Sequence, residues 1–266
     1  YYLNIQKKYG KDKQRRTELR IFDTIDATKV AVANEKFYAN FEEGFIGTSL
    51  KKDQYLFDCS DIDDIITFRK DGSMKVVKVE AKTFIGKDIL HVAVWKKNDK
   101  RTVYNMIYRE GREGPYYMKR FSVTGVTRNT DYPLASDKKG SETLYFSANP
   151  NGEAETVTVL LKPNPRIRKN KMEINFSDLA IKGRDSKGNL VTKYAVKKVD
   201  MKEEGVSTLA PRKIWFDDTV RRLNADARGT LLGNFKGDDK ILTINTNGEV
   251  KLVSFDLGNR FDDEYL

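Results

Sequence analysis

Hydrophobic and polar residues alternate in short β-branched runs from about residue 28 onward, and many of these runs end at a glycine-centred turn. Alternation with a period of two predicts strands, and Asp-Gly or Asn-Gly supplies the positive φ that tight hairpins need. A first family of predicted hairpins turns at Gly72, Gly152 and Gly248. Their flanking strands are Ile65–Phe68 with Lys75–Val79, Tyr145–Ala148 with Thr156–Leu160, and Ile241–Ile244 with Val250–Val253.

A second family of predicted hairpins interleaves with the first and turns at Gly44, Gly114 and Gly188. Two hairpins per repeat give three repeats of four strands, at about residues 28–80, 90–161 and 176–257. Repeated four-stranded units are typical of propeller-like folds. We therefore expect an all-β, propeller-like architecture, with its longest loops in residues 200–235. A β-sandwich would fit the strands but not the paired-hairpin repeat.

The start of the chain has a different pattern. Tyr1–Tyr9 predicts a short helix that Gly10 ends, and Lys11–Arg16 reads as a basic linker. We divide the chain into a helical and basic linker, residues 1–24, and a β domain, residues 25–266. The absence of an initial Met suggests that the sequence is a piece of a longer protein.

The net charge of +10 is unevenly distributed. Residues 1–20, 96–128 and 160–200 carry local charges of +5, +6 and +7, whereas residues 35–64 and the C-terminal end are acidic. A basic chain favours polyanionic partners, with nucleic acid ahead of an anionic membrane surface. A solvated surface that is merely basic remains the alternative.

The residue inventory excludes several kinds of chemistry. One histidine, His91, and one cysteine, Cys59, are too few for most zinc sites or for Ser-His or Cys-His catalysis. His91 lies in the strand-like run Ile89–Val94, so we expect an ordinary strand residue. No apolar run is long enough to span a membrane, no signal peptide opens the chain, and a lone cysteine fits a reducing cytoplasm.

Other candidate motifs have simpler interpretations. The glycine-containing loops do not end in Gly-Lys-Ser/Thr, which excludes a Walker motif. The acid pairs Asp63/Asp64 and Asp238/Asp239 precede hairpin strands, so we expect them in turns or caps rather than on a metal. The pair Tyr116-Tyr117 could stack on bases, but one core ring and one half-exposed ring is the preferred interpretation.

The loop Gly183–Gly188 is the most informative segment. Two glycines let the backbone approach a phosphate, and Lys182, Arg184 and Lys187 place three cations within six residues. Phosphate contacts from such a loop position DNA without reading its sequence.

At this loop the sequence resembles the C-terminal domain of bacterial type IIA DNA topoisomerase A subunits, the gyrase A and topoisomerase IV A family. The resemblance extends over nearly the whole chain, from the linker-like residues 8–10 and 16–20 to the hairpin Ile241–Gly248. The repeat motifs are matched by Phe176, Ser177, Gly183, Arg184 and Gly188, and by Gly114, Tyr116, Lys119 and Arg120. The order and recurrence of these motifs carry the resemblance.

The resemblance implies a β-pinwheel, usually of five or six blades, that binds duplex DNA without sequence specificity and presents it to the DNA gate during ATP-dependent strand passage. The gyrase box Gln-Arg-Arg-Gly-Gly-Lys-Gly is absent, which favours topoisomerase IV A or a divergent gyrase A. The catalytic tyrosine of the family belongs to another domain, and Tyr1 and Tyr2 do not match its motif. The fragment is therefore expected to lack cleavage activity and cofactors. ATP, Mg²⁺, the B subunit and the A-subunit core belong to the parent topoisomerase, which is expected in the cytoplasm on the nucleoid.

We expect the DNA-binding residues to form a basic rim, with the DNA leaving it near the acidic stretch Glu42–Asp64. The alternatives are a protein-interaction propeller without a nucleic-acid role and a carbohydrate-active propeller. The latter needs paired carboxylates across a central pocket, and no acid pair stands outside a hairpin context. The expected rim residues are Arg112, Lys119, Arg120, Arg128, Lys182, Gly183, Arg184, Lys187, Gly188, Lys193, Lys197, Arg212, Lys213, Arg221 and Arg222.

Overall fold

The computed structural model describes residues 2–10, 34–136, 138–237, 239–255, 257, 259 and 261. The chain divides into two compact units, residues 1–31 and 32–266. In the first unit, α1 spans Tyr2–Tyr9, which confirms the predicted short helix. The predicted linker, Lys11–Arg16, and its boundary at residue 24 lie outside the described residues.

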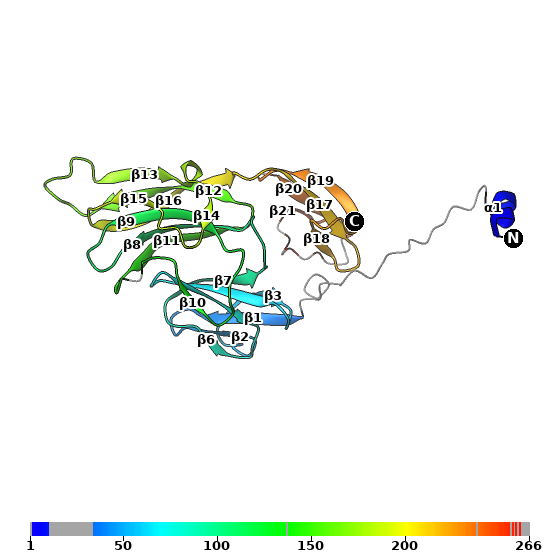
Figure 1. Cartoon of the computed structure of the whole chain (residues 1–266), viewed down its shortest axis with the longest axis horizontal. Helices are drawn as coiled ribbons and strands as arrows, with labels where there is room; N and C mark the ends of the chain where they lie inside the picture. Colours follow the sequence, from blue (N-terminus) through cyan, green and yellow to red (C-terminus); the bar gives the residue numbers. More distant parts are fainter. Residues whose placement is uncertain are drawn as a thin grey trace. The chain divides into compact units, whose positions relative to one another are not determined.

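The second unit is built from consecutive small β-sheets (Figure 1). Sheet A has the order β3-β1-β2-β6, and sheet B has the order β10-β5-β4-β7. The strands of sheet A are β1 (Glu35–Asn40), β2 (Phe45–Gly47), β3 (Gln54–Cys59) and β6 (Thr83–Phe84). Those of sheet B are β4 (Asp64–Arg69), β5 (Ser73–Lys78), β7 (Ile89–Trp95) and β10 (Asp131–Pro133).

The middle of the unit contains sheets C and D. Sheet C has the order β11-β8-β9-β14, with β15 also paired to β9, and sheet D has the order β13-β12-β16. Sheet C comprises β8 (Val103–Arg109), β9 (Tyr116–Ser122), β11 (Glu142–Asn149), β14 (Lys182–Gly183) and β15 (Asn189–Thr192). Sheet D comprises β12 (Glu153–Leu161), β13 (Lys171–Asn175) and β16 (Val196–Ser207), with the 3₁₀ turn η1 (Phe176–Asp178) after β13.

Two further sheets follow. Sheet E has the order β18-β17-β19, and sheet F is the pair β20-β21. Their strands are β17 (Arg212–Asp217), β18 (Arg222–Asn224), β19 (Thr230–Phe235), β20 (Lys240–Ile244) and β21 (Val250–Ser254). The expected long loop at residues 200–235 is therefore wrong, because most of it forms β16 to β19.

Four of the six predicted hairpins are confirmed. The strands around Gly44, Gly72, Gly114 and Gly248 pair directly with each other. The two hairpins assigned to one repeat nevertheless fall in different sheets, since the Gly44 turn belongs to sheet A and the Gly72 turn to sheet B. Among the described residues, only sheets A and B have the predicted four strands. The repeating element is therefore the sheet and not the pair of hairpins.

The predicted hairpins at Gly152 and Gly188 are wrong. Gly152 does sit in a turn with φ 66°, but β11 pairs with β8, whereas β12 pairs with β13 and β16. The turn therefore carries the chain from sheet C into sheet D. At Gly188 the two flanking strands, β14 and β15, both pair with β9 instead of with each other. At both glycines the predicted turn is present, but the strands that flank it form their hydrogen bonds with other strands.

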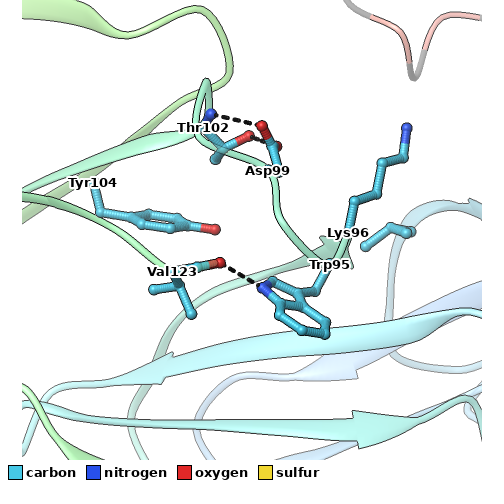
Figure 2. Close-up of a pocket in the computed structure, with 7 residues that line it drawn as sticks. Trp95, Lys96, Asp99, Thr102, Tyr104 and Val123 are labelled. Atoms are coloured by element: carbon cyan, nitrogen blue, oxygen red, sulfur yellow. Dashed lines mark hydrogen bonds between the residues drawn. The ribbon is translucent and has the colours of Figure 1, made fainter. Parts of the chain in front are cut away.

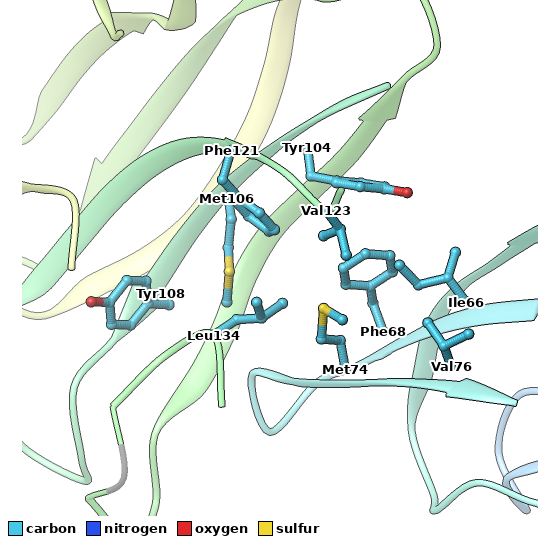
Figure 3. Close-up of a cluster of buried hydrophobic side chains, with 10 residues drawn as sticks. All are labelled: Ile66, Phe68, Met74, Val76, Tyr104, Met106, Tyr108, Phe121, Val123 and Leu134. Carbon is cyan, nitrogen blue, oxygen red and sulfur yellow. The ribbon is translucent and has the colours of Figure 1, made fainter. Parts of the chain in front are cut away.

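The core lies between successive sheets, because the central strands bury both of their faces. On β4, Ile65 packs with Phe37 and Ile46 of sheet A, while its neighbour Ile66 belongs to a cluster shared with sheet C. Figure 3 shows this second cluster, in which Phe68 from sheet B meets side chains of sheet C. Side chains alternate across a strand, so two consecutive apolar residues serve two different interfaces.

The same alternation continues through sheet C. On β8, Met106 faces sheet B, whereas Ile107 faces Val157 and Phe176 on the sheet D side. A last cluster, formed by Ile214, Leu223, Phe255 and Phe261, joins sheet E to sheet F and the residues after it. Strands buried on both faces read as near-continuous apolar runs, as in β4 and β8, where the polar residues Thr67 and Asn105 are buried as well.

The packing of Phe68 yields a stability prediction. Phe68 is 1% exposed, and its ring centroid lies 4.5 Å from those of both Tyr104 and Phe146. Phe68→Ala should lower the free energy of unfolding by about 3–5 kcal/mol, because it opens a cavity between sheets B and C. Chemical denaturation measures the loss. Phe84→Ala is the control, since Phe84 is 57% exposed and should cost less than about 1 kcal/mol. Equal losses for the two variants would contradict the two-faced core.

His91 lies within β7, as expected for a strand residue, and its ring packs near Phe68 and Phe146. Burial lowers the pKa of His91 from 6.5 to about 4. The unfolded chain therefore binds more protons than the folded chain between these two pH values. The corresponding stability is present above about pH 6.5 and is lost as the pH falls towards 4.

His91→Phe should remove this part of the pH dependence. Between pH 7 and pH 4.5 the unfolding free energy of the variant should fall by about 2 kcal/mol less than that of the parent domain. Urea titrations at the two pH values test this. Parallel losses in both proteins would show that the ring is not buried in its neutral form.

Candidate nucleic-acid interface

The loop between β14 and β15 lies along strand β9. Residues Lys182–Gly183 pair in parallel with Phe121 and Ser122, and β15 pairs antiparallel with the first residues of β9. Gly188, at φ 87°, lets the loop backbone lie close to strand β9, since a Cβ there would lie 2.3 Å from the carbonyl oxygen of Met118. Only glycine fits this position, so the loop takes its conformation from the edge of sheet C.

Lys119 holds this loop from beneath. Its ammonium group donates to the carbonyl oxygens of Leu134 at 2.5 Å, Arg184 at 2.7 Å and Ser186 at 3.2 Å. The residue is 2% exposed, and burial lowers its pKa to about 8. The expectation that Lys119 lines an outer rim is therefore wrong, because its three donor protons are used by buried backbone carbonyls.

Arg120 is also buried, at 2% exposed. One terminal nitrogen of its guanidinium donates to the carbonyl oxygens of Gly152 at 2.6 Å and Glu153 at 3.1 Å. Its pKa is lowered by burial. Arg120 is thus also corrected from a rim residue to an internal one, and it holds the turn that leads from sheet C into sheet D. Consecutive residues of a strand point to opposite faces, which places Lys119 and Arg120 under different turns.

Glu110 gathers cations from separate loops. It is 7% exposed, and its carboxylate oxygens lie 3.1 Å from the ammonium of Lys138 and 3.0 Å from that of Lys187. These two hydrogen bonds lower the pKa of Glu110. Arg112 lies against Gly140, where an added Cβ would fall 2.5 Å from the Arg112 Cγ. We call Glu110, Arg112, Lys138, Lys139 and Lys187 the Glu110 cluster; Lys139 is the exposed neighbour of Lys138.

The exposed ammonium groups of the cluster remain open to solvent, with 65% of the Lys138 side chain and 56% of the Lys187 side chain accessible. The Lys187 ammonium also lies 4.6 Å from the centre of the Tyr117 ring. Tyr116 is buried and Tyr117 is half-buried, so the preferred interpretation of this tyrosine pair is confirmed.

Arg184 ties the other end of the loop to sheet B. Its guanidinium stacks 4.3 Å from the centre of the Tyr132 ring on β10, and it donates to the carbonyl oxygen of Gly125. The β14–β15 loop therefore runs along the edge of sheet C from sheet B to the Glu110 cluster. The Arg184 side chain is 21% exposed, and its Nε also lies 3.5 Å from a carboxylate oxygen of Asp185.

The remaining expected rim residues differ in their surroundings. Arg128 makes a two-point pair with Asp64, at 2.7 and 3.0 Å, so its charge is matched within the domain. Lys182, Lys193, Lys197 and Lys213 are exposed, whereas Arg212, Arg221 and Arg222 are half-buried. The Arg212 guanidinium lies 5.9 Å from the centre of the Phe255 ring. Of the expected rim residues, Arg112 and Lys187 thus belong to the Glu110 cluster, whereas the half-buried arginines lie in sheet E and in the turn before β18.

Sequence reasoning missed Glu110, Lys138 and Lys139. The pair Lys138-Lys139 is visible in the sequence as a basic dipeptide before a glycine, but its proximity to Glu110 depends on the fold. Asp63 has the expected turn role, since it accepts from the backbone N–H of Ser60 at 2.8 Å, whereas Asp64 is the first residue of β4 and pairs with Arg128. Asp239 likewise accepts from the N–H of Lys236, and Asp238 lies outside the described residues.

A pocket at the junction of sheets B and C has room for about one water molecule (Figure 2). Trp95 donates its indole N–H to the carbonyl oxygen of Val123 there, and the Asp99 carboxylate accepts from Thr102. No group of three His, Cys, Asp or Glu side chains that could hold a metal occurs among the described residues. None of the described helices is long and apolar enough to cross a membrane.

The fold and its cationic edge define an all-β module of consecutive small sheets whose loops concentrate positive charge. The chain matches the family model described as the topoisomerase C-terminal domain of Bacteroidota over residues 36–204 and 222–266. The chain therefore belongs to the topoisomerase C-terminal domain family. It is 30% identical over 196 residues to the A subunit of DNA topoisomerase 4 from Borreliella burgdorferi. That alignment covers 73% of this chain and 29% of the relative, so the chain spans under a third of that protein.

Two solved structures are also similar in fold. The C-terminal domain of DNA topoisomerase IV matches with a TM-score of 0.44 and 10% identity, covering 86% of each chain. The DNA gyrase A C-terminal domain matches with a TM-score of 0.31 and 11% identity, covering 86% of this chain and 97% of the other.

The role of Lys119 can be tested directly. Lys119→Met should leave buried carbonyl oxygens without a donor and lower the free energy of unfolding by about 2–4 kcal/mol. Amide hydrogen exchange should accelerate in residues 183–189, because the ammonium fixes that loop from below. Lys182→Met, at an exposed position next to the loop, is the matched control. Exchange in the loop that is identical in the two variants would rule out the holding role.

Proposed function

We propose that this domain binds duplex DNA along the edge formed by the Glu110 cluster and the β14–β15 loop. The observation that carries the proposal is the convergence of cations from three separate loops on one edge, next to a buried carboxylate that holds two of them. Lysine and arginine side chains on such an edge suit phosphates, because each contact releases a counterion from the DNA.

The placement of these cations favours contacts with the DNA backbone over contacts with the bases. The cations come from loops rather than from a helix or a ribbon that could enter the major groove, so phosphate contacts would set position and not sequence. Binding without sequence preference agrees with a domain that holds DNA for another part of an enzyme. In a type IIA topoisomerase the held segment would be presented to the DNA gate.

The parent enzyme is part of this proposal. Membership of the topoisomerase C-terminal domain family supports a parent that carries out ATP- and Mg²⁺-dependent strand passage with its other domains and with the B subunit. The domain itself would contribute DNA binding and no cleavage chemistry, and it would act in the cytoplasm on the nucleoid. The missing gyrase box favours a parent of the topoisomerase IV A type or a divergent gyrase A.

A protein-interaction role is the second candidate, and one observation favours it. The cross-strand pairs Leu242 with Leu252 and Ile244 with Val250 place four aliphatic side chains on one face of sheet F, each 41–67% exposed. Exposed apolar faces are typical of interfaces. This face lies on a different sheet from the Glu110 cluster, so the two roles can be tested separately.

A salt series tests DNA binding. The logarithm of the association constant should fall with the logarithm of salt concentration, with a slope of about −5 for roughly six contacted phosphates. Arg112→Gln/Lys139→Gln/Lys182→Gln should reduce the size of that slope by about 2–3, because three exposed cations are removed and the two Glu110 pairs remain. Lys36→Gln/Lys51→Gln/Lys52→Gln removes the same charge from exposed positions on sheet A and its loops.

The control should keep the parental slope within about one unit. A parental slope near zero would overturn the function, and equal effects of the two triple variants would show that net charge rather than this edge attracts DNA.

A further inference from the structure

The loop that joins β12 to β13, residues 162–170, is restrained by hydrogen bonds at its base and within it. Its base is closed by the N–H of Leu161, which donates to the carbonyl oxygen of Asn170 at 2.7 Å. Within it, Asn164 accepts from the N–H of Arg166 at 2.9 Å through its side chain and from the N–H of Ile167 at 3.0 Å through its carbonyl. The prolines at 163 and 165 restrict the backbone further.

Ile167 anchors this loop to the core. It is half-buried and packs against the cluster shared by sheets C and D. Its neighbours Arg166 and Arg168 are exposed, as are Lys162 and Lys169. An anchored residue between two arginines keeps both guanidinium groups at the surface, and the restrained backbone of the loop has less conformational entropy to lose when it meets a ligand.

The charge of this loop is not balanced locally. No acidic residue occurs between Glu155 and Glu173 in the sequence. The lysines on the adjoining strands are different, since Lys198 lies 2.6 Å from Asp200 and Lys202 lies 2.9 Å from Glu173. Three strand lysines of sheet D, Lys171, Lys198 and Lys202, are therefore paired within the sheet, whereas no ion pair forms with the loop cations among the described residues.

The loop is also connected to the Glu110 cluster through the backbone. Thr192, at the end of β15, pairs with Tyr116, the first residue of β9 after the cluster's turn. Three residues later, the carbonyl oxygen of Ala195 accepts from the N–H of Lys162 at 2.7 Å. Residues 192–195, including the exposed Lys193, thus lead from the edge of sheet C to the loop of sheet D. In Figure 1 this loop projects beyond the end of β13.

We propose that the β12–β13 loop is a second contact site for the sugar-phosphate backbone, so that one DNA duplex runs from the Glu110 cluster across Lys193 to Arg166 and Arg168. The inference rests on the proposed DNA binding and adds to it a defined path over two sheets. Guanidinium groups suit this position because their planar donor pairs match phosphate oxygens.

Two variants of equal charge test the site. Arg166→Gln/Arg168→Gln/Lys169→Gln removes three loop cations and leaves Ile167 and the Asn164 turn in place. Lys171→Gln/Lys198→Gln/Lys202→Gln removes three cations from the adjoining strands, each of which is ion-paired. On a duplex of about thirty base pairs, the loop variant should bind about tenfold more weakly and lose about 2–3 units of salt slope, while the strand variant stays near the parent.

Duplex length provides the second measurement. On progressively shorter duplexes the parent and the loop variant should converge, because a short duplex held at the Glu110 cluster no longer reaches the loop. Constant loss at every length, or equal losses for the loop and strand variants, would overturn the path. Thermal unfolding should be the same for all three proteins.

The outcome separates this inference from the proposed function. If the loop variant keeps the parental slope while Arg112→Gln/Lys139→Gln/Lys182→Gln loses slope, DNA binding stands and the second site falls. If neither variant changes the slope, the DNA-binding proposal falls as well. Binding of the parent, but not of the loop variant, to vesicles of phosphatidylserine and phosphatidylcholine, with DNA affinity unchanged, would assign the loop to lipid phosphates and overturn the inference.

Discussion

The structure depends on sheets that bury both faces. On strand β4, Ile65 is buried against sheet A and its neighbour Ile66 is buried against sheet C. The strand therefore has no face left for solvent. Polar function is then confined to strand ends, edges and loops. The Glu110 cluster and the β14–β15 loop lie at just such places, so the position of the basic surface follows from the way the core is built.

The same constraint explains why two cations that suggest DNA contact from the sequence are internal. On β9 both faces are covered, and Lys119 and Arg120 each find buried backbone carbonyls of a neighbouring turn. A buried cation is tolerated when such acceptors surround it. Both residues have a structural role, since Lys119 shapes the loop that carries Arg184 and Lys187, and Arg120 fixes the step between sheets C and D.

Local signals in the sequence predicted what is local in the structure. Glycine turns at Gly44 and Gly72 were found because their strands pair with their neighbours in sequence, and the helix before Gly10 was found for a similar reason. The turn at Gly152 has the same chemistry, yet its strands pair elsewhere, which no local pattern encodes. Charge density likewise located Arg112 and Lys187 but could not separate exposed from buried cations or reveal Glu110.

The buried carboxylate of Glu110 lies among basic loops, and its contacts with two lysines explain its position there. Lys138 and Lys187 come from different loops, and Glu110 between them offsets the repulsion of their ammonium groups. Its contacts with both lysines tie the two loops to the end of β8. Because each lysine side chain stays more than half exposed, the carboxylate organises the cations without hiding them. One buried acid thereby makes a surface of basic loops into a defined one.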